Sequence, residues 1–228
     1  MVRVHDGAKL CLLPRLAICD LIALCGLVHH LAQTCQAVML VAHRKHVHEV
    51  KALFGEANVR FTFVNGWGDL YGPRDVLAAA RQAGYEVVPI ASVGDCCPYR
   101  LLGVDPLEYK AGFRLARRLE DEQDLHDRIV HEVGPAYVVV HDDESRRIRD
   151  DLLPPGVPVV RVRDPRWRRP SVFDWIRAID GARELHVVHS CFAALAHALA
   201  LRPPSVLHAY ASPCGARARY AATRVVYG

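Results

Sequence analysis

Several short stretches place chemically useful side chains just after apolar, strand-like segments of the sequence. Asp20 follows the first such segment, and HDDESR at 141–146 follows a later one. An arginine-rich stretch at 161–169 and the tripeptide HSC at 189–191 come after two more. A carboxylate in such a place suits a general base. Arginine side chains and helix N-termini suit the phosphates of a bound nucleotide.

Asp20 stands at the start of a predicted amphipathic helix. Leu10 to Leu31 reads as a buried strand, a turn and a helix whose N-terminus points to the carboxyl edge of a sheet, where ligands bind in open α/β sheets. Asp20 is either the cap of this helix, stabilising it by roughly 0.5–2 kcal/mol, or a functional carboxylate at that edge. The apolar positions at helical spacing are Leu21, Leu24, Cys25, Val28, Leu31 and Ala32.

The later strand ends form a candidate site for a nucleotide diphosphate or its ribose. His141, Asp142 and Arg146 end one predicted strand, where a turn capped by aspartate is the alternative interpretation. Ser190 and Cys191 directly precede a predicted helix, so their backbone N–H groups would point at an anion. Ser190 is equally suited to capping that helix.

A dense basic run surrounds Trp167. Its arginines are Arg161, Arg163, Arg166, Arg168 and Arg169. Such a run is usually a solvated loop. Its position beside the predicted anion site makes Arg163, together with Arg146, a candidate phosphate ligand.

No cofactor or metal site is predicted. The histidines at 29–30 and 43–48 lack the spacing of a zinc cluster. Asp142 and Asp143 have no third carboxylate at a spacing that suits a dedicated Mg²⁺ site. The Gly-x-Gly-x-x-Gly, P-loop, Gly-x-Ser-x-Gly and HExxH motifs are absent, which excludes the common dinucleotide, NTPase, hydrolase and zincin sites.

Strand-like and helix-like segments alternate along nearly the whole chain, as in parallel sheets with helices on their faces. Strands are expected near 10–14, 36–42, 58–64, 86–91, 136–143, 157–162, 184–190 and 204–210. Helices are expected near 20–33, 44–54, 73–84, 107–132, 171–180 and 191–201, with a loop at 92–106. The alternation predicts two Rossmann-like α/β halves, 1–106 and 107–228, with a cleft between them.

Composition indicates a soluble, cytoplasmic protein. The 228 residues carry a net charge of +4, which permits an anionic ligand without requiring nucleic acid. No apolar stretch reaches the roughly 20 residues that span a bilayer, and the N-terminus does not resemble a secretory signal.

Four stretches, in order along the chain, resemble a known family. CDLIALCGLVHHLA at 19–32 is similar to the Gly-Asp-His-Ile…Asn-Gly-Leu-Val-Arg-x-Leu-Ala opening of small GT-B-type glycosyltransferase-like proteins related to the ADP-heptose lipopolysaccharide heptosyltransferases. YKAGFRLARRL at 109–119, YVVVHDDESRRI at 137–148 and the segment 171–199 follow in register.

The resemblance implies a compact GT-B-like, metal-independent glycosyltransferase. It would move a sugar from a nucleotide-diphosphate donor to a hydroxyl of a glycan or another acceptor. Asp20 is implied as the general base, and 189–191 resembles the donor-phosphate loop, which points to Ser190 and the Cys191 backbone. Residues 1–106 would form the acceptor-side domain and 107–228 the nucleotide-sugar-side domain.

The sequence departs from the family pattern at Cys19, Leu21 and His189, where the family has glycine, a polar residue and commonly aspartate. The altered turn motivates a second hypothesis, a catalytically inactive nucleotide or nucleotide-sugar binding module. A nucleic-acid-binding protein that uses the Arg161–Arg169 loop ranks last, because the clustered aromatic residues of a stacking platform are missing. A sugar-nucleotide epimerase of the same two-domain plan is a smaller alternative.

Overall fold

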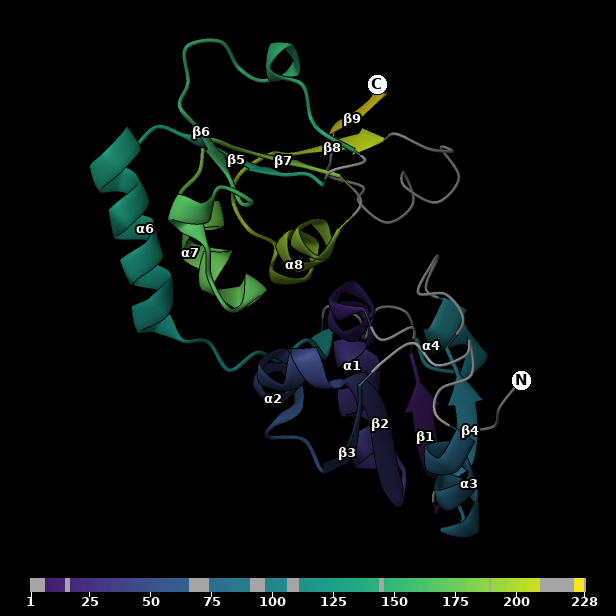
Figure 1. Ribbon diagram of the computed structural model, residues 1–228. Helices are drawn as coiled ribbons and strands as arrows, with labels where there is room; N and C mark the ends of the chain where they lie inside the picture. Colours follow the sequence, from purple (N-terminus) through teal and green to yellow (C-terminus); the bar gives the residue numbers. More distant parts are fainter. Residues whose placement is uncertain are drawn as a thin grey trace. The chain divides into compact units, whose positions relative to one another are not determined.

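The chain folds into two compact units, Met1–Ala116 (unit 1) and Arg117–Gly228 (unit 2). The computed structural model describes residues 7–14, 17–65, 74–90, 97–105, 111–143, 146–188, 190–209 and 224–227. Each unit is built around one parallel sheet with helices between its strands (Figure 1). The predicted α/β fold is confirmed, and the expected cleft stays a prediction.

Unit 1 contains a four-stranded parallel sheet of order β3-β2-β1-β4. The strands are β1 (Lys9–Leu13), β2 (Ala37–His43), β3 (Val59–Val64) and β4 (Glu86–Pro89). The helices are α1 (Ile18–Thr34), α2 (Val47–Phe54), α3 (Arg74–Gln82) and α4 (Cys97–Leu101), with a 3₁₀ turn η1 (Arg44–His46). The chain adds β2 and β3 on one side of β1 and then crosses back to add β4 on the other side. The switch point of this sheet therefore lies between β1 and β4.

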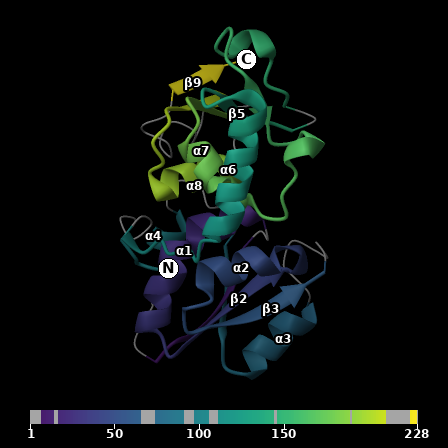
Figure 2. The ribbon, with the colours of Figure 1, turned by 90° about the vertical axis from the view of Figure 1, so that its left-hand side faces the viewer.

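Strand β1 of the unit 1 sheet is buried on both faces. Helices α2 and α3 lie on opposite sides of the strands (Figure 2). Cys11 and Leu13 of β1 pack with Leu77 and Ala80 of α3. Leu12, which points to the opposite face, is also fully buried. Strands buried on both faces read as continuous apolar runs, which is how β1 reads in the sequence.

Helix α1 begins before the predicted position. Its N-cap is Ala17, whose side chain makes no capping bond, and Asp20 lies in the first turn. The interpretation of Asp20 as the helix cap is therefore wrong. Ile22 and Leu27 are buried in addition to the predicted stripe, because other segments of unit 1 cover a second side of the helix.

The connection between the units differs from the prediction. The region 92–106, predicted as a loop, contains helix α4. Of the helix expected over 107–132, the structure describes α6 from Leu119 onward, and residues 107–110 lie outside the described residues. The chain leaves unit 1 after Ala116, whereas the predicted boundary is after residue 106. The physical reason is that the Ala116 N–H donates to the Ala52 carbonyl at 2.8 Å and the Arg114 N–H donates to Cys25 Sγ at 3.4 Å.

Unit 2 contains a five-stranded parallel sheet of order β6-β5-β7-β8-β9. The strands are β5 (Val138–His141), β6 (Val159–Arg161), β7 (Glu184–Val187), β8 (Ser205–Ala209) and β9 (Arg224–Tyr227), of which β9 was not predicted. The helices are α6 (Leu119–Val133), α7 (Ile176–Asp180) and α8 (Cys191–Leu199). After β6 the chain crosses back over β5 and forms β7 on its other side, so the switch point of this sheet lies between β5 and β7.

The two faces of the unit 2 sheet are covered differently. Helices α6, α7 and α8 lie on one side (Figure 1), where Trp167 and Trp175 join the core. On the other side, Ile148 and Leu153 from the β5–β6 crossover pack on Val138 and Val140. The described part of that crossover holds only the 3₁₀ turn η3 (Asp150–Leu152). Within the described residues, no helix is long and apolar enough to cross a membrane.

Candidate functional site

The switch point of unit 2 brings two predicted site segments together. His141 ends β5 and pairs in register with Val187 of β7. The Val188 N–H donates to the His141 carbonyl at 3.1 Å, so the two strands stay joined to their ends. The segments that follow, towards Asp142 and towards Ser190, therefore diverge from one point at the carboxyl edge of the sheet. His189 and Ser145, two members of the predicted site segments, lie outside the described residues.

The His141 imidazole stacks on the ring of Phe192 in α8. The ring centroids are 4.3 Å apart and the interplanar angle is 17°. The Trp175 ring packs edge-on against the same Phe192 ring, with the two ring centroids 5.9 Å apart. Burial lowers the pKa of His141 to about 4, so the imidazole is neutral at neutral pH. Its Nδ1 is buried and has no hydrogen-bond partner among the described residues.

Ser190 is the N-cap of α8 but does not cap it through its side chain. Its backbone is extended, with φ −155° and ψ 175°, and its Oγ makes no capping bond. This Oγ is buried and has no partner in the described part of the chain. The N-terminus of α8, which begins at Cys191, is the positive end of the helix dipole. The arrangement can bind an anion or a hydroxyl.

Asp142 and Asp143 hold neighbouring chain segments in place. Asp142 is buried, and its Oδ2 accepts from the Ile148 N–H at 3.0 Å and from the Arg161 guanidinium. Asp143 accepts from the backbone N–H and from Nε of Arg146, each at 2.8 Å. In this geometry Asp142 ties the crossover to the strand ends, and Asp143 orients the Arg146 side chain.

Two of the predicted phosphate ligands lie close enough to His141 to act on its ionisation. The charges of Arg146 and Arg163 both lower the pKa of His141, while Asp142 and Asp143 raise it. Arg163 is exposed. The predicted donor-binding residues are thus gathered around one strand end, with the Phe192 ring linking His141 to the start of α8.

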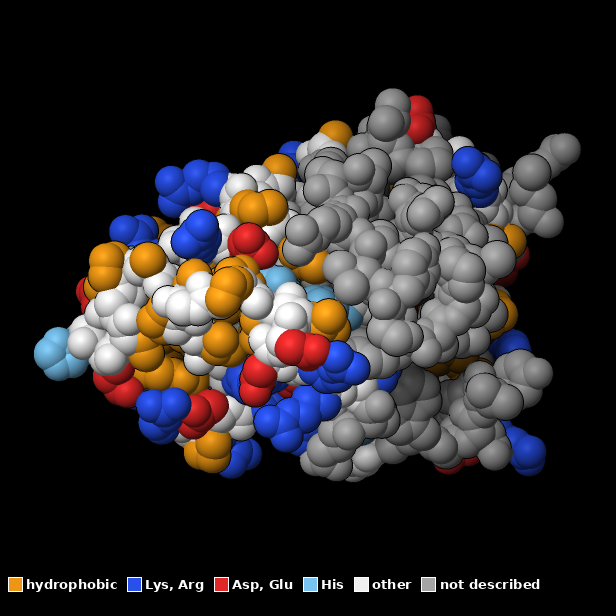
Figure 3. Space-filling view, turned by 90° about the horizontal axis from the view of Figure 1, so that it is seen from above, with side chains coloured by type: hydrophobic (Ala, Val, Ile, Leu, Met, Phe, Trp, Pro, Cys, Tyr) orange, Lys and Arg blue, Asp and Glu red, His pale blue; other side chains and the backbone are white. Residues whose placement is uncertain are grey.

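The basic run at 161–169 is not an exposed patch of one charge. Arg161 binds Asp142 and Asp150, Arg166 binds Asp164, and Arg169 binds Asp124. Figure 3 shows blue and red side chains interspersed over the described part of one face. Trp167 is 1% exposed and belongs to the core. Trp167 is therefore not on the surface that the nucleic-acid-binding alternative would use.

Asp20, the predicted base, belongs to unit 1. It lies in the first turn of α1, which follows β1 and so starts near the switch point of the unit 1 sheet. Its N–H donates to the Ala17 carbonyl at 3.1 Å. The predicted base and the predicted donor-binding residues thus belong to different units.

The histidines of unit 1 have structural contacts. His29 Nε2 bonds the Leu53 carbonyl at 2.8 Å, and the His43 side chain accepts from the Lys45 N–H at the start of η1. Burial, aided by the neighbouring positive charge of Lys45, lowers the pKa of His46 to about 4. Within the described ranges, no group of three or more His, Cys, Asp or Glu residues is arranged to hold a metal ion.

A chain of polar side chains on the crossover face of unit 2 was not predicted. His186 Nε2 bonds Glu184 Oε2 at 2.9 Å, and His186 Nδ1 lies 3.1 Å from His208 Nε2. Both histidines are buried. The alternation of Glu184 and His186 along β7 is the signal that places them on one face.

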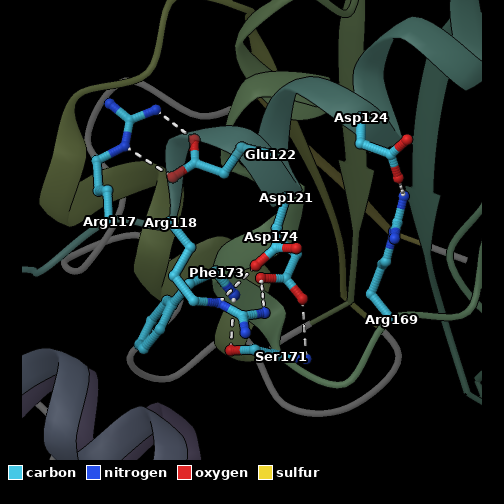
Figure 4. A network of polar contacts seen from close by, with 9 residues as sticks. All are labelled: Arg117, Arg118, Asp121, Glu122, Asp124, Arg169, Ser171, Phe173 and Asp174. Atoms are coloured by element: carbon cyan, nitrogen blue, oxygen red, sulfur yellow. Dashed lines mark hydrogen bonds and ion pairs between the residues drawn. The ribbon is translucent and has the colours of Figure 1, made fainter.

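A second polar network anchors the start of α6 (Figure 4). Arg117 forms a two-pronged bond with the buried Glu122. Arg118 binds the buried Asp174 at 2.7 Å and also Asp121 at 3.0 Å. None of these residues was singled out from the sequence, because each pair joins side chains of ordinary types without a recognisable motif.

Comparison with known proteins gives a likeness of fold. No family model matches the sequence, and no curated protein is significantly similar to it. A solved structure, the glycosyl transferase family 9 protein from Veillonella parvula DSM 2008, aligns over 100% of this chain and 88% of its own, with a TM-score of 0.55 and 7% sequence identity. At this identity the match shows that the two chains share an α/β architecture.

Proposed function

We propose that the protein is a glycosyltransferase that moves a sugar from a nucleotide-diphosphate donor to an acceptor hydroxyl. One observation carries the proposal: Ser190 Oγ and His141 Nδ1 are buried without partners, in the described part of the chain, at the unit 2 switch point. Buried polar atoms nearly always have a hydrogen-bond partner. A bound donor would supply these partners at the edge where ligands bind in such sheets.

The donor diphosphate would lie against the N-terminus of α8. Backbone N–H groups from Cys191 onward and the Ser190 hydroxyl would donate to its oxygens, and Arg163 and Arg146 would offset its charge. These groups would stabilise the negative charge that develops on the leaving diphosphate. We propose that they do so without a metal ion, as the family resemblance implies.

Asp20 would act on the acceptor. As the acceptor oxygen forms its bond to the anomeric carbon, its proton passes to the Asp20 carboxylate. The bond between the anomeric carbon and the diphosphate oxygen breaks, and its electron pair stays on the diphosphate. General-base catalysis of this kind contributes about 10²–10⁴-fold.

Donor binding is tested by thermal unfolding with a panel of nucleotides and nucleotide sugars, with and without added Mg²⁺. A ligand at about 100 times its Kd should stabilise the protein by roughly 2.7 kcal/mol. Ser190→Ala should weaken the shift. Ser171→Ala is the matched control, because Ser171 is also an N-cap but its Oγ accepts from the Phe173 N–H at 3.3 Å. The control should lower stability and leave the ligand-induced shift intact.

Catalysis is tested with the identified donor and an acceptor screen. Asp20→Asn should keep donor binding and lose about 10²–10⁴-fold in turnover. Asp75→Asn is the control, because Asp75 also lies in the first turn of a unit 1 helix and is exposed. Equal turnover in wild type and Asp20→Asn would remove Asp20 from the mechanism. Binding without transfer to any acceptor would favour the nucleotide-sugar binding module.

A further inference from the structure

The Tyr99 side chain joins the two segments that flank the switch point of the unit 1 sheet. Tyr99 belongs to α4, the helix after β4, and its hydroxyl reaches α1, the helix after β1. Strands β1 and β4 are parallel neighbours. A side chain that bridges the segments after them holds the ligand-binding edge of this sheet together.

The Tyr99 hydroxyl bonds two backbone groups of α1. It donates to the Ala23 carbonyl at 3.0 Å and accepts from the Leu27 N–H at 3.0 Å. In a regular α-helix these two groups, at residues i−4 and i, are the acceptor and the donor of one backbone hydrogen bond. Tyr99 is 2% exposed. Because burying a hydroxyl without partners is unfavourable, the bonds hold the hydroxyl at this turn of α1.

The residues of α1 at this contact leave room for it. Positions 23, 26 and 27 share one face of the helix by their spacing. Ala23 has a short side chain and Gly26, which is buried, has none, so the hydroxyl can approach the helix backbone.

The first turn of α1 depends on bonds other than a cap. Ala17 offers no side-chain cap, and its carbonyl is shared by the N–H groups of Asp20 at 3.1 Å and Leu21 at 3.3 Å. Asp20 lies one turn before Ala23. The Tyr99 bonds therefore act on the turn directly after the one that carries the carboxylate.

We infer that Tyr99 is a positioning residue, which fixes the turn of α1 that carries Asp20 and so the direction of its carboxylate. The inference rests on the proposed function for the role of Asp20. It extends that function to a residue that would touch neither donor nor acceptor.

The test is Tyr99→Phe, which removes the hydroxyl and keeps the ring. Tyr137→Phe is the matched control: Tyr137 is fully buried in unit 2, and its hydroxyl donates to the Ala178 carbonyl of α7 at 2.8 Å. Tyr99→Phe should lower kcat about tenfold and leave the KM for the donor unchanged. It should also speed amide hydrogen exchange at residues 20–27. Tyr137→Phe should change neither of these.

The two readouts separate the inference from the proposed function. If Asp20→Asn abolishes turnover and Tyr99→Phe keeps the wild-type kcat, the positioning role is overturned while the glycosyltransferase stands. If no transfer is found, or Asp20→Asn is fully active, the assignment of Asp20 fails. Amide hydrogen exchange is then the remaining test of the positioning role. Faster exchange at residues 20–27 in Tyr99→Phe supports positioning of this turn, and unchanged exchange overturns it.

Discussion

Unit 1 and unit 2 are both parallel α/β sheets, yet different interactions hold their interiors together. Among the described residues, unit 1 buries one charged side chain, Glu49. Unit 2 buries a larger polar set: Glu122, Asp142, Ser171, Asp174, His186 and His208. The same architecture can therefore be stabilised mainly by apolar packing in one half and by packing plus buried polar pairs in the other.

The buried carboxylates of unit 2 lie where a regular element begins or ends. Glu122 and Asp174 anchor the first turn of α6 and the 3₁₀ turn η5 (Val172–Trp175), and Asp142 follows β5. A buried ion pair adds little net stability compared with apolar packing, but breaking one is costly. The comparison suggests that these pairs hold the loops of unit 2, including those around His141, in one arrangement.

The largest effect is expected from a cavity in unit 1. Leu12→Ala should lower the free energy of unfolding of unit 1 by about 3–4 kcal/mol, because Leu12 is fully buried at the centre of the sheet and its truncation leaves a void. Peptide-resolved hydrogen exchange would locate the loss. Leu119→Ala, at a side chain that is 64% exposed, should have little effect. An equal loss of stability in both units would contradict the proposal that the two interiors are stabilised separately and differently.

The next effect concerns the carboxylates that share Arg118. Asp174→Ala should destabilise unit 2 by about 2–3 kcal/mol, because Asp174 is buried and bonds both Arg118 and the Ser171 N–H. Asp121→Ala removes the exposed partner of the same arginine and should cost less than about 1 kcal/mol. Denaturant unfolding of both variants measures the difference. Similar losses would show that burial of the pair does not matter.

Acid should weaken unit 2 through His141. The folded-state pKa of about 4 lies below the ordinary histidine pKa of 6.5, so between these two pH values the unfolded chain binds more protons. The free energy of unfolding therefore falls as pH decreases from about 6.5 to 4, by up to about 3 kcal/mol. His141→Phe, which keeps a ring against Phe192, should flatten this dependence. An unchanged pH profile in that variant would contradict the assignment.

Salt should have the smallest effect. The pairs Arg166–Asp164 and Arg202–Asp180 involve arginines that are 60% and 78% exposed. Such exposed pairs stabilise a protein little and are screened by ions. Raising NaCl to about 1 M should lower the stability of unit 2 by less than about 1 kcal/mol. Arg202→Gln should reduce the salt dependence. Unit 1 should respond less, because its His46–Glu49 contact at 3.9 Å involves an imidazole whose lowered pKa keeps it neutral at neutral pH.

Periodicity predicted the fold well, because buried parallel strands and their crossover helices leave strong local patterns. The strand ends at His141 and the helix start at Ser190 were visible for this reason. The start of α1 was misplaced because Ala17 carries no capping signal. The partners of Asp142 and Asp143 could not be foreseen. Arg161 reaches Asp142 from the neighbouring strand β6, and the bond between Arg146 and Asp143 depends on the geometry of the loop. Tyr99 was missed because α4 is short and lies next to a glycine- and proline-rich stretch.

The junction between the units has one further consequence, for recombination. The backbone of Ala116 is bonded to unit 1 at Ala52, and the next residue, Arg117, is bonded to Glu122 of unit 2. No spare linker separates these anchors. A chimaera that exchanges one unit for that of another chain would have to be spliced at this single peptide bond, because a joint placed a few residues to either side would carry one unit's anchor into the other half.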